Sequence, residues 1–305
     1  GKKKTEDCFV SDSLTGAFKG KCIIDDDMGY HGLGVAQGGM VDTPDGDWYA
    51  FMFQDRGALG RAPVLMPMHF EDGFPIIGEN GKVPEVVTVL DTGYQYAAIN
   101  GSDDFFYKPD ENGQITLKNF WEFNHQQMDD FWSVTENPGH LRLHSAKLSP
   151  TLFQAYNTLT QRTVGPKCAA EVTLRFAHMK NGDVAGISTF IGNYGFTGVK
   201  KENDQFYLIM MGRPAKDTTV FGQFEYENPG LEYARVPIYG ESICLRAEAD
   251  FTNKRDLSSF YYKEGDNWQK LGIDQPMYFK MDLFTGCRFG LFYYSTEQTG
   301  GYVDF

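Results

Sequence analysis

The sequence of 305 residues has little cysteine, no excess of positive charge and no long apolar run. Its five cysteines are odd in number, widely spaced and free of any CxxC pair, which argues against a disulfide framework or a zinc site. We interpret them as buried thiols. The formal net charge of −13 argues against a nucleic-acid partner, because binding phosphates needs a basic surface. Since no run reaches the roughly eighteen apolar residues that span a bilayer, we expect no membrane partner.

The first residues, "GKKKTEDCF", lack the apolar stretch that follows the lysines of a secretory signal peptide. A signal was removed, never existed, or the chain begins within a longer protein. The sequence does not fix the compartment, and we prefer a secreted or periplasmic location to a cytoplasmic one. We expect no organic cofactor.

Aromatic residues make up 15% of the chain, which favours strands, and its 34 glycines suit many tight turns. From Gly38 onward, four apolar runs separated by polar turns predict an antiparallel meander: "GGMVDT", "WYAFMFQ", "APVLMPMHF" and "FPIIG". The run Trp48–Phe53 is apolar at every position, as in a strand covered on both faces. Such a meander is typical of a β-propeller blade stacked between neighbours.

The chain divides into three parts. Residues 1–90 are predicted to hold one full blade and the outer two strands of another, a partial β-propeller. Residues 91–101 are a linker. Residues 102–305 alternate as many short strands and predict a jelly-roll β-sandwich. Its expected strands are "HLRLHSA", "AAEVTLRFAHM", "VAGISTFIG", "QFYLIMM", "VFGQFEYE", "SICLRAEADF", "SSFYYKEG" and "CRFGLFYYS". The fold class is all-β.

Several long motifs carry a resemblance to a known family. The stretch "VAQGGMVDTPDGDWYAFMFQDRGALGRAPVLMPMHFEDGFPIIG" resembles the last blade of family 43 glycoside hydrolases, the β-xylosidase and α-L-arabinofuranosidase group. The segments "DDFWSVTENPGHLRLHS", "NTLTQRTVGPK", "GDVAGISTF" and "FTGCRFGLFYYSTEQTGGYVDF" are similar to the concanavalin-like sandwich of many members. The resemblance covers the chain from about residue 6 to its end.

This resemblance implies a five-bladed propeller and hydrolysis of xylan or arabinoxylan glycosides with inversion, by paired carboxylates about 6.5–9.5 Å apart. In the family, the three catalytic acids lie on blades ahead of the point where this sequence begins. We therefore expect no catalytic residue here and an inactive chain that supplies only substrate contacts. The alternative is a non-catalytic, carbohydrate-binding sandwich module.

By family position, Gln37 and Arg61 are expected at the bound sugar, because amide and guanidinium groups give directed hydrogen bonds to hydroxyls. Arg61 can equally pair with Asp55 as a structural ion pair. His31 is a further candidate beside the propeller axis, although a loop histidine is more often simply hydrogen-bonded. Phe284, in "DLFTG", matches a family aromatic that walls off the sugar, or it packs in the core.

Calcium is the one cofactor that the resemblance suggests. Asp103 or Asp104 and Asp304 match carboxylates that bind a cation between the first and last strands of related sandwiches, and hard oxygen ligands suit Ca²⁺. The "SDD" run can also be an ordinary solvated turn. The expected partners are a xylo- or arabino-oligosaccharide and, for the open meander, a second copy or a chain that supplies the missing blades.

Overall fold

The computed structural model describes residues 4–89, 92–213, 228–278 and 285–305. The chain forms two compact units, Gly1–Gln95 (unit 1) and Tyr96–Phe305 (unit 2), and their boundary falls inside the predicted linker. The described residues contain strands and short 3₁₀ turns, η1 (Gly57–Leu59), η2 (Asp129–Phe131), η3 (Leu152–Gln154) and η4 (Thr252–Lys254). No helix in these ranges has the length and apolar character needed to cross a membrane.

Unit 1 consists of a hairpin and a four-stranded antiparallel meander, as the sequence predicts. The hairpin pairs β1 (Glu6–Val10) with β2 (Lys19–Ile24). The meander runs in chain order through β3 (Ala36–Asp42), β4 (Trp48–Asp55), β5 (Arg61–Glu71) and β6 (Phe74–Ile77). The turn between β3 and β4 is the "TPDG" segment, whose Gly46 has a φ of 90°, a conformation that glycine adopts without strain.

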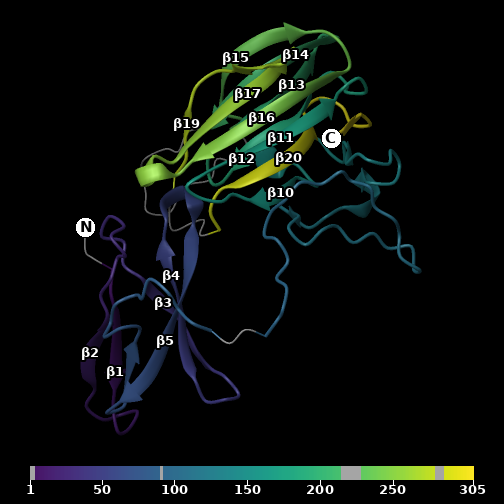
Figure 1. Cartoon of the computed structure of the whole chain (residues 1–305). Coiled ribbons are helices and arrows are strands. Elements are labelled where there is room, and N and C mark those ends of the chain that lie inside the picture. Colours follow the sequence, from purple (N-terminus) through teal and green to yellow (C-terminus); the bar gives the residue numbers. More distant parts are fainter. Residues whose placement is uncertain (1–3, 90–91, 214–227, 279–284) are drawn as a thin grey trace. The chain divides into compact units, whose positions relative to one another are not determined.

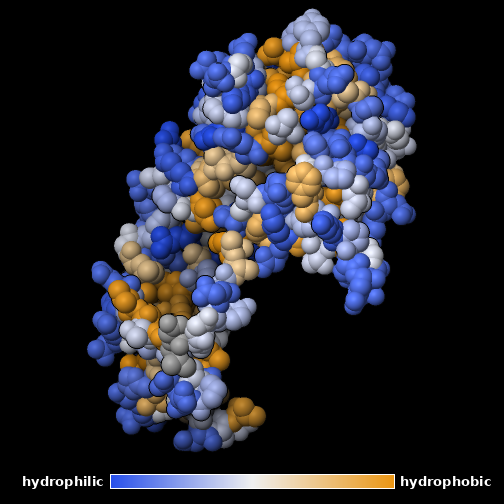
Figure 2. Space-filling model, turned by 45° about the vertical axis from the view of Figure 1, so that its right-hand side comes forward, coloured by the Kyte–Doolittle hydropathy of each residue, from blue (hydrophilic) through white to orange (hydrophobic). Residues whose placement is uncertain are grey.

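One face of the meander makes the core of unit 1. Ala50 and Met52 of β4 pack with Met66 of β5, and Ile24 of the hairpin joins the same buried cluster. The other face is different, because Phe51 is 54% exposed and Leu65 lies beside it in register at the surface. Within the described residues of unit 1, the expectation that β4 is covered on both faces is therefore wrong, because the buried cluster covers one face and Phe51 is exposed on the other. Hydrophobic residues (orange) are visible at the surface in Figure 2.

Unit 2 is a sandwich of two antiparallel sheets, shown in teal to yellow in Figure 1. The seven-stranded sheet has the order β15 (Leu231–Ile238), β14 (Gln205–Arg213), β13 (Tyr194–Glu202), β12 (Asp183–Phe190), β20 (Arg288–Ser295), β10 (Leu159–Arg162) and β7 (Glu122–Phe123). The eight-stranded sheet has the order β18 (Asn267–Lys270), β17 (Leu257–Glu264), β16 (Ser242–Asp250), β11 (Lys167–Arg175), β21 (Tyr302–Asp304), β9 (Arg142–His144) and β8 (Trp132–Ser133), with β19 (Gln275–Pro276) beside β17.

The central strands β12 and β20 of the seven-stranded sheet are buried on both faces, so they show no alternation of buried and exposed residues. On one face, Phe196 and Phe292 pack with Leu152 of η3 in a single cluster. The other face packs on the eight-stranded sheet. There Gly195 has no room for a side chain, because a Cβ atom would lie 2.8 Å from the ring of Phe260.

All five cysteines are free thiols, in agreement with the sequence. The expectation that they are buried holds only for Cys287, because Cys22 is exposed and the other three are intermediate. One predicted strand, "VFGQFEYE", lies outside the described residues.

Candidate functional site

A group of four side chains, the end cluster, lies where β4 ends and β5 begins: Lys4, Phe53, Asp55 and Arg61. Arg61 Nε donates to Asp55 Oδ1 at 3.2 Å, and its guanidinium lies 4.1 Å from the centre of the Phe53 ring. Lys4 Nζ donates to the other carboxylate oxygen of Asp55 at 3.1 Å and lies equally close to that ring. Since both oxygens of Asp55 bind cations, this carboxylate holds Lys4 and Arg61 side by side at the end of the meander.

Gln37 lies at the same end of the meander. It is the extra residue of a β-bulge, with a φ of 63°, and its neighbour Ala36 pairs with Phe53 of the end cluster. A bulge re-aims a side chain at the end of a strand. The backbone N–H of Gln37 donates to Glu6 Oε2 at 2.8 Å, which fixes the bulge to the hairpin. The register thus brings Gln37 and Arg61 to one end of the sheet, on either side of β4.

The structure places His31 in the loop between β2 and β3, in a turn with a φ of 57°. The ring centres of His31 and Tyr30 lie 4.9 Å apart in an edge-on arrangement, and the guanidinium of Arg56 lies 4.2 Å from the centre of the Tyr30 ring. These contacts are those of an ordinary exposed loop histidine, and a sugar contact by His31 stays a prediction. Phe284 lies outside the described residues.

The three carboxylates expected to bind calcium lie in separate surroundings. Asp304 is bound through both oxygens by Arg142, at 2.7 and 2.9 Å. Asp103 accepts hydrogen bonds from Tyr107, from Trp121 Nε1 at 2.8 Å and from Lys118 Nζ at 3.0 Å. Asp104 is exposed and caps the backbone of its own turn. The described residues contain no group of three or more His, Cys, Asp or Glu that could hold a metal ion. The calcium site stays a prediction.

Protein partners already stabilise the charged forms of two of these acids. Burial alone would raise the pKa of Asp103, but hydrogen bonds from Tyr107, Trp121 and Lys118 hold it below its usual value. Burial would likewise raise the pKa of Asp304, and its bonds to Arg142 and Asn137 lower it instead.

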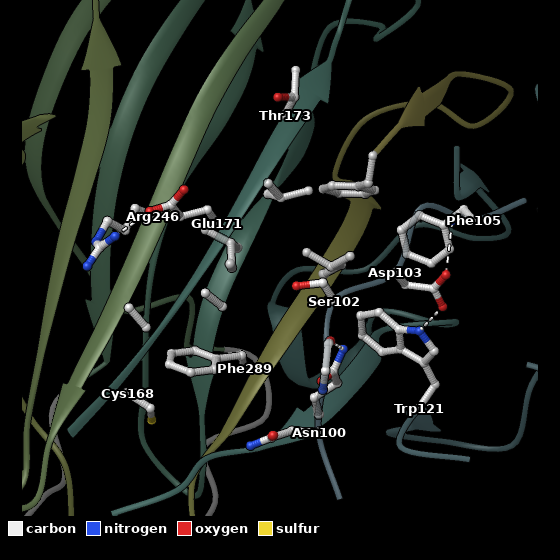
Figure 3. A pocket seen from close by; sticks show the side chains of 18 of the residues that line it. Asn100, Ser102, Asp103, Phe105, Trp121, Cys168, Glu171, Thr173, Arg246 and Phe289 are labelled. Atoms are coloured by element: carbon white, nitrogen blue, oxygen red, sulfur yellow. Dashed lines mark hydrogen bonds and ion pairs between the residues drawn. The ribbon is translucent and has the colours of Figure 1, made fainter. Parts of the chain in front are cut away.

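A feature that the sequence reasoning missed lies in unit 2, where the eight-stranded sheet is interrupted. β11 pairs with β16 along its whole length but with β21 only at Arg175, so a groove of about 820 Å³ follows β11. Figure 3 shows Cys168, Glu171 and Arg246 on one side of it and Phe105, Asp103 and Trp121 on the other. The small inward residues of β11, Cys168 and Ala170, are the sequence signal for this space, because they leave room that larger side chains would fill.

The two units together define an all-β protein that joins a propeller-type meander to a concanavalin-like jelly-roll sandwich. Residues 110–305 match the family model of the beta-xylosidase C-terminal concanavalin A-like domain. The chain therefore belongs to glycoside hydrolase family 43, as a C-terminal portion with this domain.

The solved structures that are similar to this chain include a bifunctional family 43 protein from Bacteroides eggerthii. Its structure is 37% identical, with a TM-score of 0.79 over 98% of this chain and 36% of that one. An engineered family 43 hydrolase with endo-xylanase and exo-arabinofuranosidase activity is 28% identical, also with a TM-score of 0.79, over 98% of this chain and 59% of that one. A beta-xylosidase from Formosa agariphila is 26% identical over 96% of this chain and 50% of its own length. The chain thus spans about half the length of this curated relative.

Proposed function

We propose that this chain is the C-terminal portion of an inverting glycoside hydrolase that acts on β-xylosides or α-L-arabinofuranosides of the xylan and arabinoxylan type. In this proposal the chain contributes sugar contacts from Gln37 and Arg61, with Phe284 as a wall of the sugar site, and the catalytic carboxylates lie on other blades. The observation that supports it is the strand register, which puts Gln37 and Arg61 at the same end of a family 43 blade, with Arg61 hydrogen-bonded to Asp55. The names of the relatives support the substrate class.

The proposal is tested by titrating the purified chain with xylotriose and with arabinofuranosyl xylotriose, followed by amide chemical shifts. We expect shifts at Gln37 and Arg61 and an affinity that falls about tenfold in Arg61→Ala, since one charge-assisted hydrogen bond contributes about 1.5–3 kcal/mol. Arg255→Ala, an exposed arginine of unit 2, is the matched control and keeps the affinity of the wild type. The same preparation is expected to release no sugar from aryl β-xyloside or aryl α-L-arabinofuranoside.

The same titration separates the second candidate, a non-catalytic sandwich that binds carbohydrate. The groove beside Trp121 favours it, because an indole face can stack on a sugar ring. Shifts confined to Trp121 and its neighbours would support that candidate and contradict contact at the meander. Turnover of an aryl glycoside that is lost in Arg61→Ala would contradict the inactive-chain proposal.

The exposed face of the meander supports association with a second copy or with a chain that supplies further blades. We expect Phe51→Lys to weaken concentration-dependent association at least tenfold in sedimentation velocity, because burying a phenylalanine contributes about 1.5–3 kcal/mol. Leu14→Lys, at the fully exposed tip of the hairpin, is the control and leaves association unchanged. A wild-type chain that stays monomeric at every concentration would argue against this surface.

A further inference from the structure

The outer face of the eight-stranded sheet carries a hollow over β16 and β17, which we call the outer hollow. Its volume is about 520 Å³. The outward residues of these two strands are partly exposed and alternate with inward, buried ones such as Leu245 and Phe260. Both strands have a neighbouring strand on each side. The outer hollow therefore offers a ligand side chains rather than free backbone groups.

Small side chains form the floor of the outer hollow. The register places Ala169 of β11, Glu248 of β16 and Ser259 of β17 in one row across the sheet. The next row along the same strands holds the longer side chains of Arg246 and Tyr261, which lie directly opposite each other. Because Ala169 and Ser259 are much smaller than these neighbours, the surface is lower along the first row.

Two half-buried aromatic rings stand on this face. Tyr261 lines the outer hollow and lies opposite Lys270 of β18, and Trp268 comes two residues before Lys270, so both rings share the outer face. The guanidinium of Arg246 lies 5.7 Å from the centre of the Trp268 ring. Within the described residues, the Tyr261 hydroxyl and the Trp268 Nε1 atom have no hydrogen-bond partner. Such a ring stacks on an apolar sugar face while its unused donor reaches a hydroxyl.

Ion pairs hold the polar side chains of the outer hollow in place. Arg246 Nε donates to Glu248 Oε1 at 2.7 Å, and Arg246 also bonds to Glu171, as the close view in Figure 3 shows. Lys270 Nζ lies 2.6 Å from Asp274 Oδ1. The other oxygen of Glu248, Oε2, accepts no hydrogen bond from the described part of the chain. It is a fixed acceptor beside the row of small side chains.

The charges of the outer hollow are balanced. Its two remaining cations, Lys167 and Arg255, lie 3.1 and 3.5 Å from Asp250 Oδ2. Each cation that lines the hollow thus has a carboxylate partner, as Arg246 and Lys270 do. A site without an excess of either charge favours a neutral ligand over an anion.

We propose that the outer hollow is a carbohydrate-binding site, separate from Gln37 and Arg61, that takes a neutral oligosaccharide stacked on Tyr261 and Trp268. Hydroxyls of the sugar bond to the ion-paired side chains and to Glu248 Oε2, because these groups are held as directed donors and acceptors. A peptide strand fits less well, since neither β16 nor β17 has a free edge. The xylan class of the oligosaccharide rests on the proposed function, whereas the site itself does not.

The test titrates the purified chain with xylohexaose and follows amide and indole chemical shifts. We expect shifts at the Trp268 indole and at the amides of Ser259 and Tyr261. The affinity at this site should fall about tenfold in Trp268→Ala, because a stacked ring supplies much of the contact, and Trp268→Phe should restore most of it. Tyr239→Ala is the matched control, since this aromatic is 84% exposed in the turn before β16, and it keeps the affinity of the wild type.

The balance of charge gives a second readout. The affinity for xylohexaose should be the same at low and at high salt, because a neutral ligand has no charge for the ions to screen. Oligogalacturonate, a sugar chain that carries carboxylates, should bind no more tightly than xylohexaose. Tighter binding of oligogalacturonate that weakens with salt would overturn the assignment of a neutral ligand.

Arg61→Ala separates this proposal from the proposed function. It should leave the shifts at Trp268 and Tyr261 unchanged, and Trp268→Ala should leave those at Gln37 and Arg61 unchanged. Shifts at Gln37 and Arg61 without any at Trp268 or Tyr261 would overturn the outer hollow and keep the proposed function. Shifts at the outer hollow alone would support it and contradict the contacts in unit 1. Shifts at Trp121 alone would place the sugar in the groove along β11 and overturn the proposal.

Discussion

Asp304→Ala is expected to lower the stability of unit 2 by ~3 kcal/mol, because it removes the carboxylate that binds the Arg142 guanidinium through both oxygens and leaves the exposed Glu136 at 3.3 Å. The side chain of Asp304 is 8% exposed and that of Arg142 is 17% exposed, so water replaces little of the lost interaction. For a domain of this size, the melting temperature should fall by roughly 6–12 °C in differential scanning calorimetry. Asp266→Ala, in an exposed hairpin turn, is the control and should change it little.

The same ion pair predicts a dependence on acid. The pKa of Asp304 is lower in the folded chain than in the unfolded chain, so the unfolded chain takes up a proton first as the pH falls. The contribution of Asp304 is therefore complete above about pH 4, near the unfolded-state pKa, and is lost as the pH falls through the folded-state pKa. In Asp304→Ala, the free energy of unfolding should depend less on pH in this acidic range.

A double-mutant cycle with Arg142→Leu and Asp304→Leu measures the coupling. The double variant should be more stable than the two single changes predict, since neither charge is then left alone. Additive effects would contradict the ion-pair account.

Calcium ions, added to the wild type and to Arg142→Ala, test the predicted calcium site in the same samples. A calcium site at Asp304 requires that the ions raise the melting temperature of both.

Asp183→Ala is expected to destabilise unit 2 by a similar amount, about 2–4 kcal/mol, through a buried polar network. Asp183 is completely buried at the start of β12, and its carboxylate accepts hydrogen bonds from Tyr293 Oη at 2.6 Å, from Ser295 Oγ and from the Lys180 backbone N–H at 2.5 Å. Ser295 also contacts Ser145 Oγ at 2.6 Å, which extends the network to the segment that follows β9. Alanine would leave several buried donors without an acceptor.

The pH dependence of Asp183 has the opposite sign to that of Asp304. Burial raises the pKa of Asp183, although hydrogen bonds from Ser295 and Tyr293 oppose the shift. Between the unfolded-state pKa and the higher folded-state pKa, the folded chain holds a proton that the unfolded chain has lost. The contribution of this proton on Asp183 to the free energy of unfolding is therefore complete below the unfolded-state pKa. It is lost as the pH rises through the folded-state pKa.

Asp183→Asn is the informative variant, because the amide oxygen still accepts from Tyr293 and does not titrate. Urea unfolding across this pH window should show stability falling with pH in the wild type and not in Asp183→Asn. Equal slopes for the two proteins would show that Asp183 does not titrate in this way. A stability loss below 1 kcal/mol in Asp183→Ala, as for a surface residue, would show that the network contributes little.

Part of the fold followed directly from local sequence pattern. The meander strands β3 to β6, the hairpin of β1 and β2, and the sandwich strands β11, β12, β16 and β20 all fall on predicted runs. Strand β13 was not among the predicted strands, because Gly195 and Gly198 weaken its pattern. The packing explains the first of these glycines, since Phe260 occupies the place of a side chain at Gly195. Local pattern did not show this because Phe260 lies on another sheet.

Some features of the candidate site could likewise be predicted from the sequence, and others could not. Family position and strand order sufficed to name Gln37 and Arg61 as candidates, and the six-residue separation across the β4–β5 turn made the Asp55–Arg61 pair foreseeable. The ion pair of Asp304 was not foreseen, because its partner, Arg142, comes 162 residues earlier and the β9–β21 pairing brings them together. The exposed face of β4 was also unforeseen, since the apolar run is the same whether or not a neighbour covers it.

By itself the sequence determined the strand periods, the turns, the two-part organisation and the family resemblance, because each depends on residues close together in the chain. The tertiary structure alone decided which distant strands pair, which carboxylate meets which cation, and where the eight-stranded sheet stays open along β11. These depend on register and packing between segments far apart in sequence, where a few neighbouring side chains hold no information about the partner.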